Sequence, residues 1–142
     1  MNKYIFLIFI FGLLILTSCK QEKNETKVAI EGQTWWKEGI LYQIYPQSFK
    51  DSDRDGFGDF RGIIEKLDYI DSLGVSIVWM NPFFDSPLVD NGYDVADYRA
   101  IHPRYGNMTD FQEMLDGFHK RGIKFVLDVV VNHSSDQHEW FK

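Results

Sequence analysis

Val75-Ser76-Ile77-Val78-Trp79-Met80 is an almost unbroken apolar stretch near the middle of the chain. Such a run is typical of a strand that is buried on both faces of a parallel sheet. Residues 60–73, just before it, predict a helix that stops at Gly74, because apolar side chains recur there at helical spacing. The members of this stripe are Ile63, Ile64, Leu67, Ile70 and Leu73.

Two further apolar stretches extend this pattern. Residues 40–45 are rich in strand-forming side chains and stop before Pro46, and residues 124–131 predict a third buried strand. Between the second and third strands, residues 109–120 predict a helix with Thr109 as its N-cap and Gly122 after its end. About three strands alternating with two helices predict an α/β fold with a parallel sheet. Polar segments that follow such strands meet at one edge, where sites form in this class.

Composition excludes some classes of function. The chain has 142 residues, 44% hydrophobic and 25% charged, which is a folding composition rather than a disordered one. Its net charge of −6 argues against a nucleic-acid binder, which needs basic side chains against phosphates. The aromatic fraction of 16% suits either a sugar-binding surface or a well-filled core, and composition alone favours the core. A single cysteine excludes a disulfide within the chain.

Residues 1–19 are predicted to be a lipoprotein signal peptide. A basic start at Lys3 is followed by an apolar run over residues 4–16, shorter than the roughly 20 residues of a spanning helix. Leu16-Thr17-Ser18-Cys19 resembles a bacterial lipobox, in which the cysteine becomes the lipidated N-terminus. The alternatives are an uncleaved anchor or an ordinary signal. Residues 20–34 predict a flexible linker, so the domain is expected over residues 35–142 of an exported, membrane-anchored lipoprotein.

Asp51-Ser52-Asp53-Arg54-Asp55-Gly56-Phe57-Gly58-Asp59 alternates carboxylates with other residues. A chain that coils around one point would direct these oxygens inward, with Gly56 allowing the sharp turn and Phe57 offering its carbonyl. Hard oxygen ligands of this kind suit Ca²⁺. The segment matches the first nine positions of an EF-hand loop but has Gly62 instead of the final glutamate. The alternative is an acidic surface turn, although its carboxylates would repel one another without a cation.

Two other segments carry candidate binding residues. Asp90-Asn91-Gly92-Tyr93-Asp94 combines carboxylates with an aromatic ring, a pairing that suits sugars. On spacing alone, a plain Asn-Gly turn is equally compatible. The predicted third strand delivers Asn132 and His133 at its end, where a histidine can belong either to a site or to the structure. His119 and His138 are expected to be solvated, and His102 is given no role.

These motifs, taken in order, resemble the N-terminal part of the α-amylase family (glycoside hydrolase family 13). The resemblance runs from about Trp35 to Phe141. Within the family, the chain is most similar to the oligo-1,6-glucosidase and α-glucosidase branch. The segments that carry it are Trp35-Trp36-Lys37-Glu38, Tyr42-Gln43-Ile44-Tyr45-Pro46-Gln47-Ser48-Phe49, the aspartate loop, Asn91-Gly92-Tyr93-Asp94 and Asp128-Val129-Val130-Val131-Asn132-His133.

The resemblance implies the N-terminal part of a (β/α)8 barrel and a set of site residues. Asp90 and Tyr93 would hold the terminal glucose, and His133 would bond the same sugar and stabilise the transition state. Asp128 would orient its neighbours, and Asn132 would be structural. The implied ligands of one Ca²⁺ are Asp51, Asp53, Asp55, the Phe57 carbonyl and Asp59.

The resemblance also implies a retaining α-glucosidase acting on short oligosaccharides. The family's nucleophile, acid/base and further aspartate follow the fourth, fifth and seventh strands, and none is present here. We therefore expect a fragment that hydrolyses nothing alone. The choice among α-1,4, α-1,6, sucrose and trehalose linkages stays open. A non-catalytic barrel subunit or a free-standing calcium-binding module is the alternative.

Overall fold

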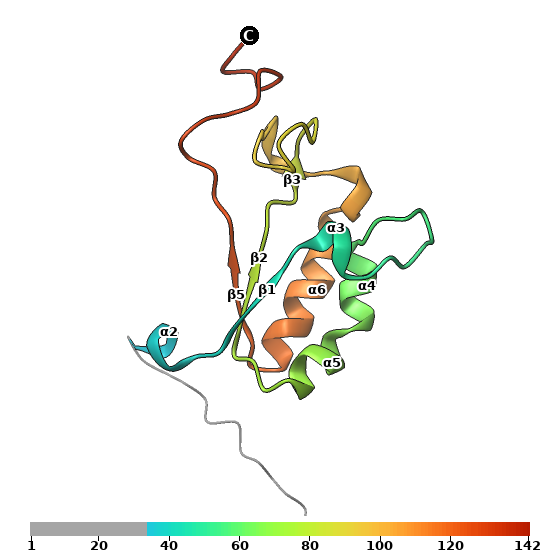
Figure 1. Cartoon of the computed structure of the whole chain (residues 1–142), viewed down its shortest axis with the longest axis vertical. Coiled ribbons are helices and arrows are strands. Elements are labelled where there is room, and N and C mark those ends of the chain that lie inside the picture. The colour runs from blue at the N-terminus through green and yellow to red at the C-terminus, as the bar shows by residue number, and fades with distance from the viewer. Residues whose placement is uncertain (1–33) are drawn as a thin grey trace, which may run out of the picture.

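The structure, a computed structural model, describes residues 34–142 (Figure 1). The predicted signal peptide, Cys19 and the linker up to residue 33 lie outside the described residues. Within the described range, helices are too short or too polar to cross a bilayer.

A parallel sheet of three strands confirms the predicted α/β arrangement. Its order is β1 (Leu41–Ile44), β2 (Ile77–Met80) and β5 (Lys124–Leu127), so β2 is central. Ile44 pairs with Met80, and Met80 pairs with Leu127. The carboxyl ends of all three strands therefore lie at one edge, as predicted.

The third strand is shorter and more exposed than predicted. It ends at Leu127, and Val129 and Val131 are 61% and 87% exposed. The chain leaves the sheet after the Asp128 N–H bonds the Met80 carbonyl. Among the described residues, β5 pairs with β2 alone, so one of its edges is uncovered.

The longer helices lie together on one side of the sheet, whereas α2 lies apart from them (Figure 1). The helix predicted over residues 60–73 is divided at Lys66 into α4 (Phe60–Glu65) and α5 (Leu67–Ser72). The second predicted helix is α6 (Met108–Lys120), and its N-cap is Asn107 rather than Thr109. Asn107 is the cap because its side chain accepts the Thr109 and Asp110 N–H groups, while Asp110 accepts the N–H of Asn107.

The long predicted loop over residues 81–105 contains regular structure. β3 (Phe84–Asp85) and β4 (Asp97–Ile101) form an antiparallel pair, and a 3-10 helix, η1 (Pro103–Tyr105), follows. Two single-turn helices, α2 (Trp35–Glu38) and α3 (Pro46–Phe49), flank β1. The sequence did not predict this pair of strands, because both strands are short and half-exposed and therefore carry no clear apolar pattern.

The core fills the space between the sheet and the helices. Phe60 lies at its centre, fully buried, and meets the Phe83 ring edge-on at 5.4 Å between centroids. Each such side chain contributes roughly 1.5–3 kcal/mol by burial. Arg61 of α4 bonds Asp110 and Glu113 of α6, both at 2.7 Å, which ties the two helices at the surface.

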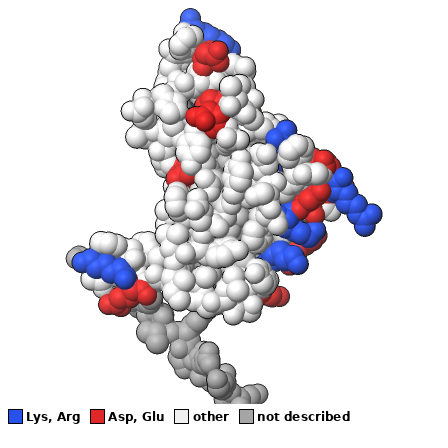
Figure 2. Space-filling model, in the orientation of Figure 1, with Lys and Arg blue, Asp and Glu red and all other residues white. Residues whose placement is uncertain are grey.

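Charges of both signs lie beside one another on the face shown in Figure 2, and much of the middle of this face is uncharged. This face therefore offers no continuous basic stripe for a nucleic acid, in agreement with the net charge of −6.

Candidate functional site

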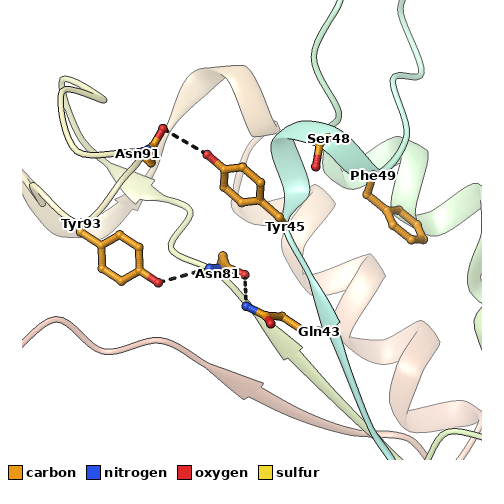
Figure 3. Close-up of a pocket in the computed structure, with 7 residues that line it drawn as sticks. All are labelled: Gln43, Tyr45, Ser48, Phe49, Asn81, Asn91 and Tyr93. Carbon is orange, nitrogen blue, oxygen red and sulfur yellow. Dashed lines mark hydrogen bonds between the residues drawn. The ribbon is translucent and has the colours of Figure 1, made fainter.

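Polar side chains gather at the carboxyl edge of the sheet around an open cavity of about 630 Å³ (Figure 3). β1 supplies Gln43, the residue after β2 is Asn81, and Tyr93 comes from the turn beyond β3. The remaining lining residues are Tyr45, Ser48, Phe49 and Asn91. This is the edge at which parallel α/β folds place their sites.

The turn at residues 90–94 is held tightly against β2. Asn91 and Gly92 have φ values of 53° and 96°, and a Cβ on Gly92 would lie 3.1 Å from the Pro82 carbonyl oxygen. The Asp94 carboxylate accepts Ser86 Oγ at 2.7 Å and the Val89 N–H at 2.9 Å. Burial raises the pKa of Asp94, but these hydrogen bonds outweigh it, so the pKa is lowered.

Tyr93 is anchored through its hydroxyl. The hydroxyl donates to Asp128 Oδ2 at 2.8 Å and accepts from Asn81 Nδ2 at 3.2 Å. Burial, followed by the bond to Asp128, raises the pKa of Tyr93, and the charge of Asp90 adds to the rise. The ring is therefore held neutral beside two carboxylates.

Asp90 and His133 both meet Tyr93. The Asp90 carbonyl accepts the Tyr93 N–H at 2.9 Å, and His133 Nε2 lies 3.1 Å from the Tyr93 carbonyl oxygen. A carbonyl only accepts, so this contact places a proton on Nε2, while Nδ1 faces the Asn132 amide at 3.4 Å. Both contacts are to the backbone of Tyr93. Of the three predicted sugar-binding residues, Tyr93 lines the cavity, while Asp90 and His133 are exposed beside it and are not among the lining residues.

Tyr98 of β4 fixes the segment that carries His133, and the sequence alone did not single it out. Its hydroxyl lies 2.7 Å from the Val130 carbonyl and 2.9 Å from the His133 carbonyl. Its ring also packs beside His138, which is only 8% exposed and also contacts Trp140. The prediction that His138 is solvated is therefore wrong, because the aromatic neighbours bury it.

Gln43, Trp79 and Asn81 were also missed. Gln43 is a polar residue inside an apolar strand, and Asn81 is the first polar residue after the second apolar strand. Both positions could therefore have been recognised from the sequence as candidate site residues. Trp79 is part of the predicted second strand, and its indole N–H donates to Asp128 Oδ1 at 2.9 Å. Asp128 therefore bonds two neighbours, as its expected orienting role requires.

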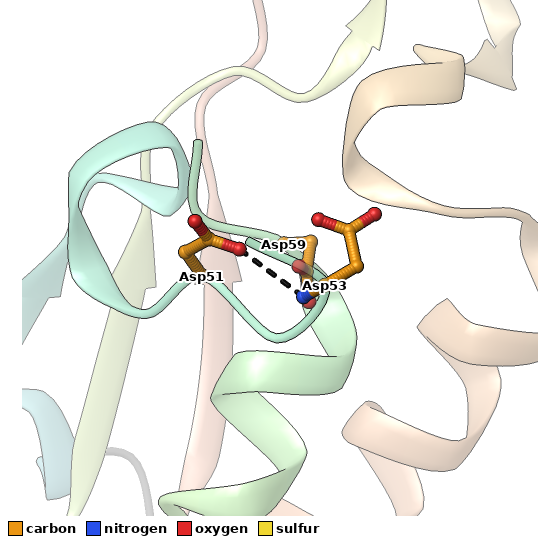
Figure 4. Close-up of side chains that lie close together, drawn as sticks. All are labelled: Asp51, Asp53 and Asp59. Atoms are coloured by element: carbon orange, nitrogen blue, oxygen red, sulfur yellow. Dashed lines mark hydrogen bonds between the residues drawn. The ribbon is translucent and has the colours of Figure 1, made fainter. Parts of the chain in front are cut away.

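The aspartate loop leads from α3 to α4 and is a separate cluster (Figure 4). Carboxylate oxygens of Asp51, Asp53 and Asp59 lie within 4.8 Å of one another. The Asp51 carboxylate accepts the N–H groups of Asp53, Arg54 and Gly56. The Gly56 bond lowers the pKa of Asp51 most, against a smaller rise from desolvation.

Asp55 lies differently from the other three aspartates. The Asp55 carboxylate accepts the Phe57 N–H at 2.8 Å and is not part of the three-carboxylate group. The Phe57 ring packs under the Arg104 guanidinium, 3.9 Å from its centre. Three converging carboxylates are hard oxygen donors, so the residues fit Ca²⁺.

Residues 43–142 match the alpha amylase catalytic domain. The chain belongs to the α-amylase family. An oligo-1,6-glucosidase of Parageobacillus thermoglucosidasius is 59% identical over 77% of this chain and 19% of its own length. Likeness to solved family structures confirms the expected barrel fold class. The trehalose-6-phosphate hydrolase of Bacillus licheniformis has a TM-score of 0.74 at 57% identity, covering 75% of this chain and 19% of that one. A MutB mutant with the substrate sucrose has a TM-score of 0.75 at 53% identity, covering 78% and 20%.

The α-amylase family chain thus spans about a fifth of the length of the relatives it matches. The matched stretch includes the cavity, the residues around Tyr93 and the aspartate loop.

Proposed function

We propose that this chain forms part of a retaining α-glucosidase that hydrolyses α-glucosidic bonds of short oligosaccharides. The observation that carries the proposal is that Tyr93 lines the cavity at the carboxyl edge of the parallel sheet, with Asp90 and His133 each in contact with its backbone. A carboxylate, an aromatic face and an imidazole N–H together suit a glucose unit. The 52–59% identity to curated oligo-1,6-glucosidases and a trehalose-6-phosphate hydrolase supports it.

Each residue has a distinct task in this proposal. Asp90 is exposed and accepts sugar hydroxyls through charge-assisted hydrogen bonds. Tyr93 packs its ring on the pyranose face. His133 donates from Nε2 to a hydroxyl of the same sugar, which requires its present bond to the Tyr93 carbonyl to be exchanged.

The test is hydrolysis by the full-length protein that carries this chain. We expect it to release glucose from isomaltose or maltose, with the anomeric configuration retained. Asp90→Ala should lower kcat/KM by roughly tenfold or more, because a charged hydrogen bond is lost. Asp116→Asn, an exposed change on α6, is the matched control. A full-length protein that releases no glucose from either disaccharide would refute the proposal.

A second candidate is a sucrose- or trehalose-derivative-acting enzyme of the same family. It is favoured by the likeness to MutB in complex with sucrose and to trehalose-6-phosphate hydrolase. A panel of isomaltose, maltose, sucrose and trehalose-6-phosphate separates the candidates by their kcat/KM ratios. A non-catalytic barrel subunit would turn over none of them.

We also propose that the aspartate loop binds one Ca²⁺ through Asp51, Asp53, Asp55, the Phe57 carbonyl and Asp59. The convergence of Asp51, Asp53 and Asp59 supports it. A bound Ca²⁺ would neutralise the mutual repulsion of these carboxylates. Calorimetry should detect binding by the full-length protein, and Asp53→Ala should abolish it. An unchanged binding isotherm in that variant would contradict the assignment.

Export as a lipoprotein anchored at Cys19 is a further proposal, supported by the lipobox and the apolar run before it. The wild-type protein should partition with membranes, and mass spectrometry should find an acylated N-terminal cysteine. A Cys19→Ala variant should lose both properties. An unprocessed N-terminus in the wild type would rule the anchor out.

A further inference from the structure

A continuous chain of hydrogen bonds crosses the carboxyl ends of all three parallel strands. Gln43 Nε2 donates to Asn81 Oδ1 at 2.8 Å, and Asn81 Nδ2 donates to the Tyr93 hydroxyl at 3.2 Å (Figure 3). The Tyr93 hydroxyl donates to Asp128 Oδ2 at 2.8 Å. Trp79 Nε1 closes the chain by donating to Asp128 Oδ1 at 2.9 Å.

The direction of these bonds is fixed by the groups involved. A carboxylate only accepts, so the single hydroxyl proton of Tyr93 points to Asp128. The hydroxyl oxygen must then accept from Asn81, whose amide oxygen is turned to Gln43. Two bonds at one oxygen hold the Tyr93 ring, so the loss of either bond leaves the ring less firmly oriented.

Asn81 is itself a firm support. It directly follows β2, it is half-buried, and its backbone N–H bonds the Ile44 carbonyl at 3.0 Å. Gln43 and Asn81 therefore connect the Tyr93 hydroxyl to β1 and β2, while Asp128 connects it to the end of β5.

We propose that Asn81, oriented by Gln43, is a positioning residue that holds the Tyr93 ring at the angle needed to stack on a glucose unit. This inference rests on the proposed glucosidase function. Stacking depends on ring orientation, so losing one of the two hydroxyl bonds weakens sugar binding. The rival role is direct contact between Asn81 and sugar, because Asn81 also lines the cavity.

A double-mutant cycle on the full-length protein separates these roles. Tyr93→Phe keeps the ring but removes the hydroxyl, and Asn81→Leu removes the amide. We expect each variant to raise KM for isomaltose about threefold to tenfold, with a smaller change in kcat. The double variant should be no worse than the more impaired single variant, because both changes break the same bond. Effects that multiply would show that Asn81 acts on the sugar directly and would overturn the inference.

Gln112→Leu on α6 is the matched control, because it removes an exposed amide that bonds a carboxylate, at 2.9 Å, away from the cavity lining. Its KM should equal that of the wild type. Should Asn81→Leu fail to fold, Asn81→Asp takes its place, since aspartate still accepts from Gln43 but has no proton for Tyr93.

A spectroscopic measurement tests the hydrogen bond without any sugar. In protein labelled with ¹³C-tyrosine, the Tyr93 signal, assigned by its absence in Tyr93→Phe, is followed through an alkaline titration. Asn81 donation lowers the pKa of Tyr93, so Asn81→Leu should move the midpoint upward. An unmoved midpoint refutes the inference even when the wild type hydrolyses isomaltose. A wild-type protein that does not hydrolyse isomaltose refutes the proposed function instead, and with it the role of Asn81 in sugar binding.

Discussion

Asp59 joins the aspartate loop to the helix behind it, and replacing it tests how much of the loop is built without a cation. Its carboxylate caps α4 by accepting the Gly62 N–H at 2.6 Å. The other oxygen accepts the Ser52 N–H and the Ser52 hydroxyl, both at 2.9 Å. The residue is only 9% exposed, so water screens these bonds little.

The expected cost of Asp59→Ala follows from these three bonds. Loss of an N-cap costs about 1 kcal/mol. Loss of the charged acceptor for Ser52 adds about 2 kcal/mol. We therefore expect the free energy of unfolding to fall by about 3 kcal/mol.

The assay is urea unfolding of the full-length protein in EDTA, which removes any contribution from bound cations. Asp59→Asn is the matched variant, because its single amide oxygen can still cap α4 but cannot also accept the two hydrogen bonds from Ser52. It should lose about half as much as Asp59→Ala. Ser52→Ala should lose less than Asp59→Asn, because the Ser52 N–H still donates to the Asp59 carboxylate. A loss below about 1 kcal/mol for Asp59→Ala would show that the loop is not organised by these bonds, and the reasoning would fail.

Three other changes test separate features. Asp94 has a lowered pKa, so its contribution to stability is present above its ordinary pKa of 3.8 and is lost as the pH falls through the folded-state value. In Asp94→Asn, the melting temperature should therefore fall less steeply as the pH decreases below about 4. An equally steep fall in this variant would contradict the stabilising role of the Asp94 carboxylate. Gly62→Ala should destabilise the protein more than Gly117→Ala. A Cβ at position 62 would lie 2.0 Å from the Lys50 carbonyl oxygen, which is backbone, whereas a Cβ at position 117 would lie 2.3 Å from the end of the Leu67 side chain, which can move. Urea unfolding compares them, and the reverse order would contradict the packing. Tyr98→Phe should cost about 1 kcal/mol in unfolding and lower kcat/KM through His133, and kinetics equal to wild type would exclude that link.

The aspartate loop could be predicted from its own nine residues. Carboxylates at alternate positions with Gly56 between them define a local geometry, and Asp51, Asp53, Asp55 and Asp59 were predicted to converge. Asp51, Asp53 and Asp59 do so, whereas Asp55 is not part of the group. The approach of His133 to the turn that carries Asp90 and Tyr93 was expected because parallel strands must end at one edge.

Other features depended on partners far away in the chain or on competition between neighbouring side chains. Whether Asn107 or Thr109 caps α6 depends on which side chain meets the free N–H groups. His138, expected to be solvated, is buried because Tyr98, forty residues earlier, packs on it.

Periodicity and short-range spacing are local properties, so the amino-acid sequence was enough to establish the α/β class, the edge that carries the site and the aspartate loop. The chain of hydrogen bonds through Gln43, Asn81, Tyr93 and Asp128 emerged only from the folded arrangement. These residues are 12 to 38 positions apart where they bond through Asn81, and 35 apart from Tyr93 to Asp128. Such bonds arise from the register of neighbouring strands, which no short stretch of sequence contains.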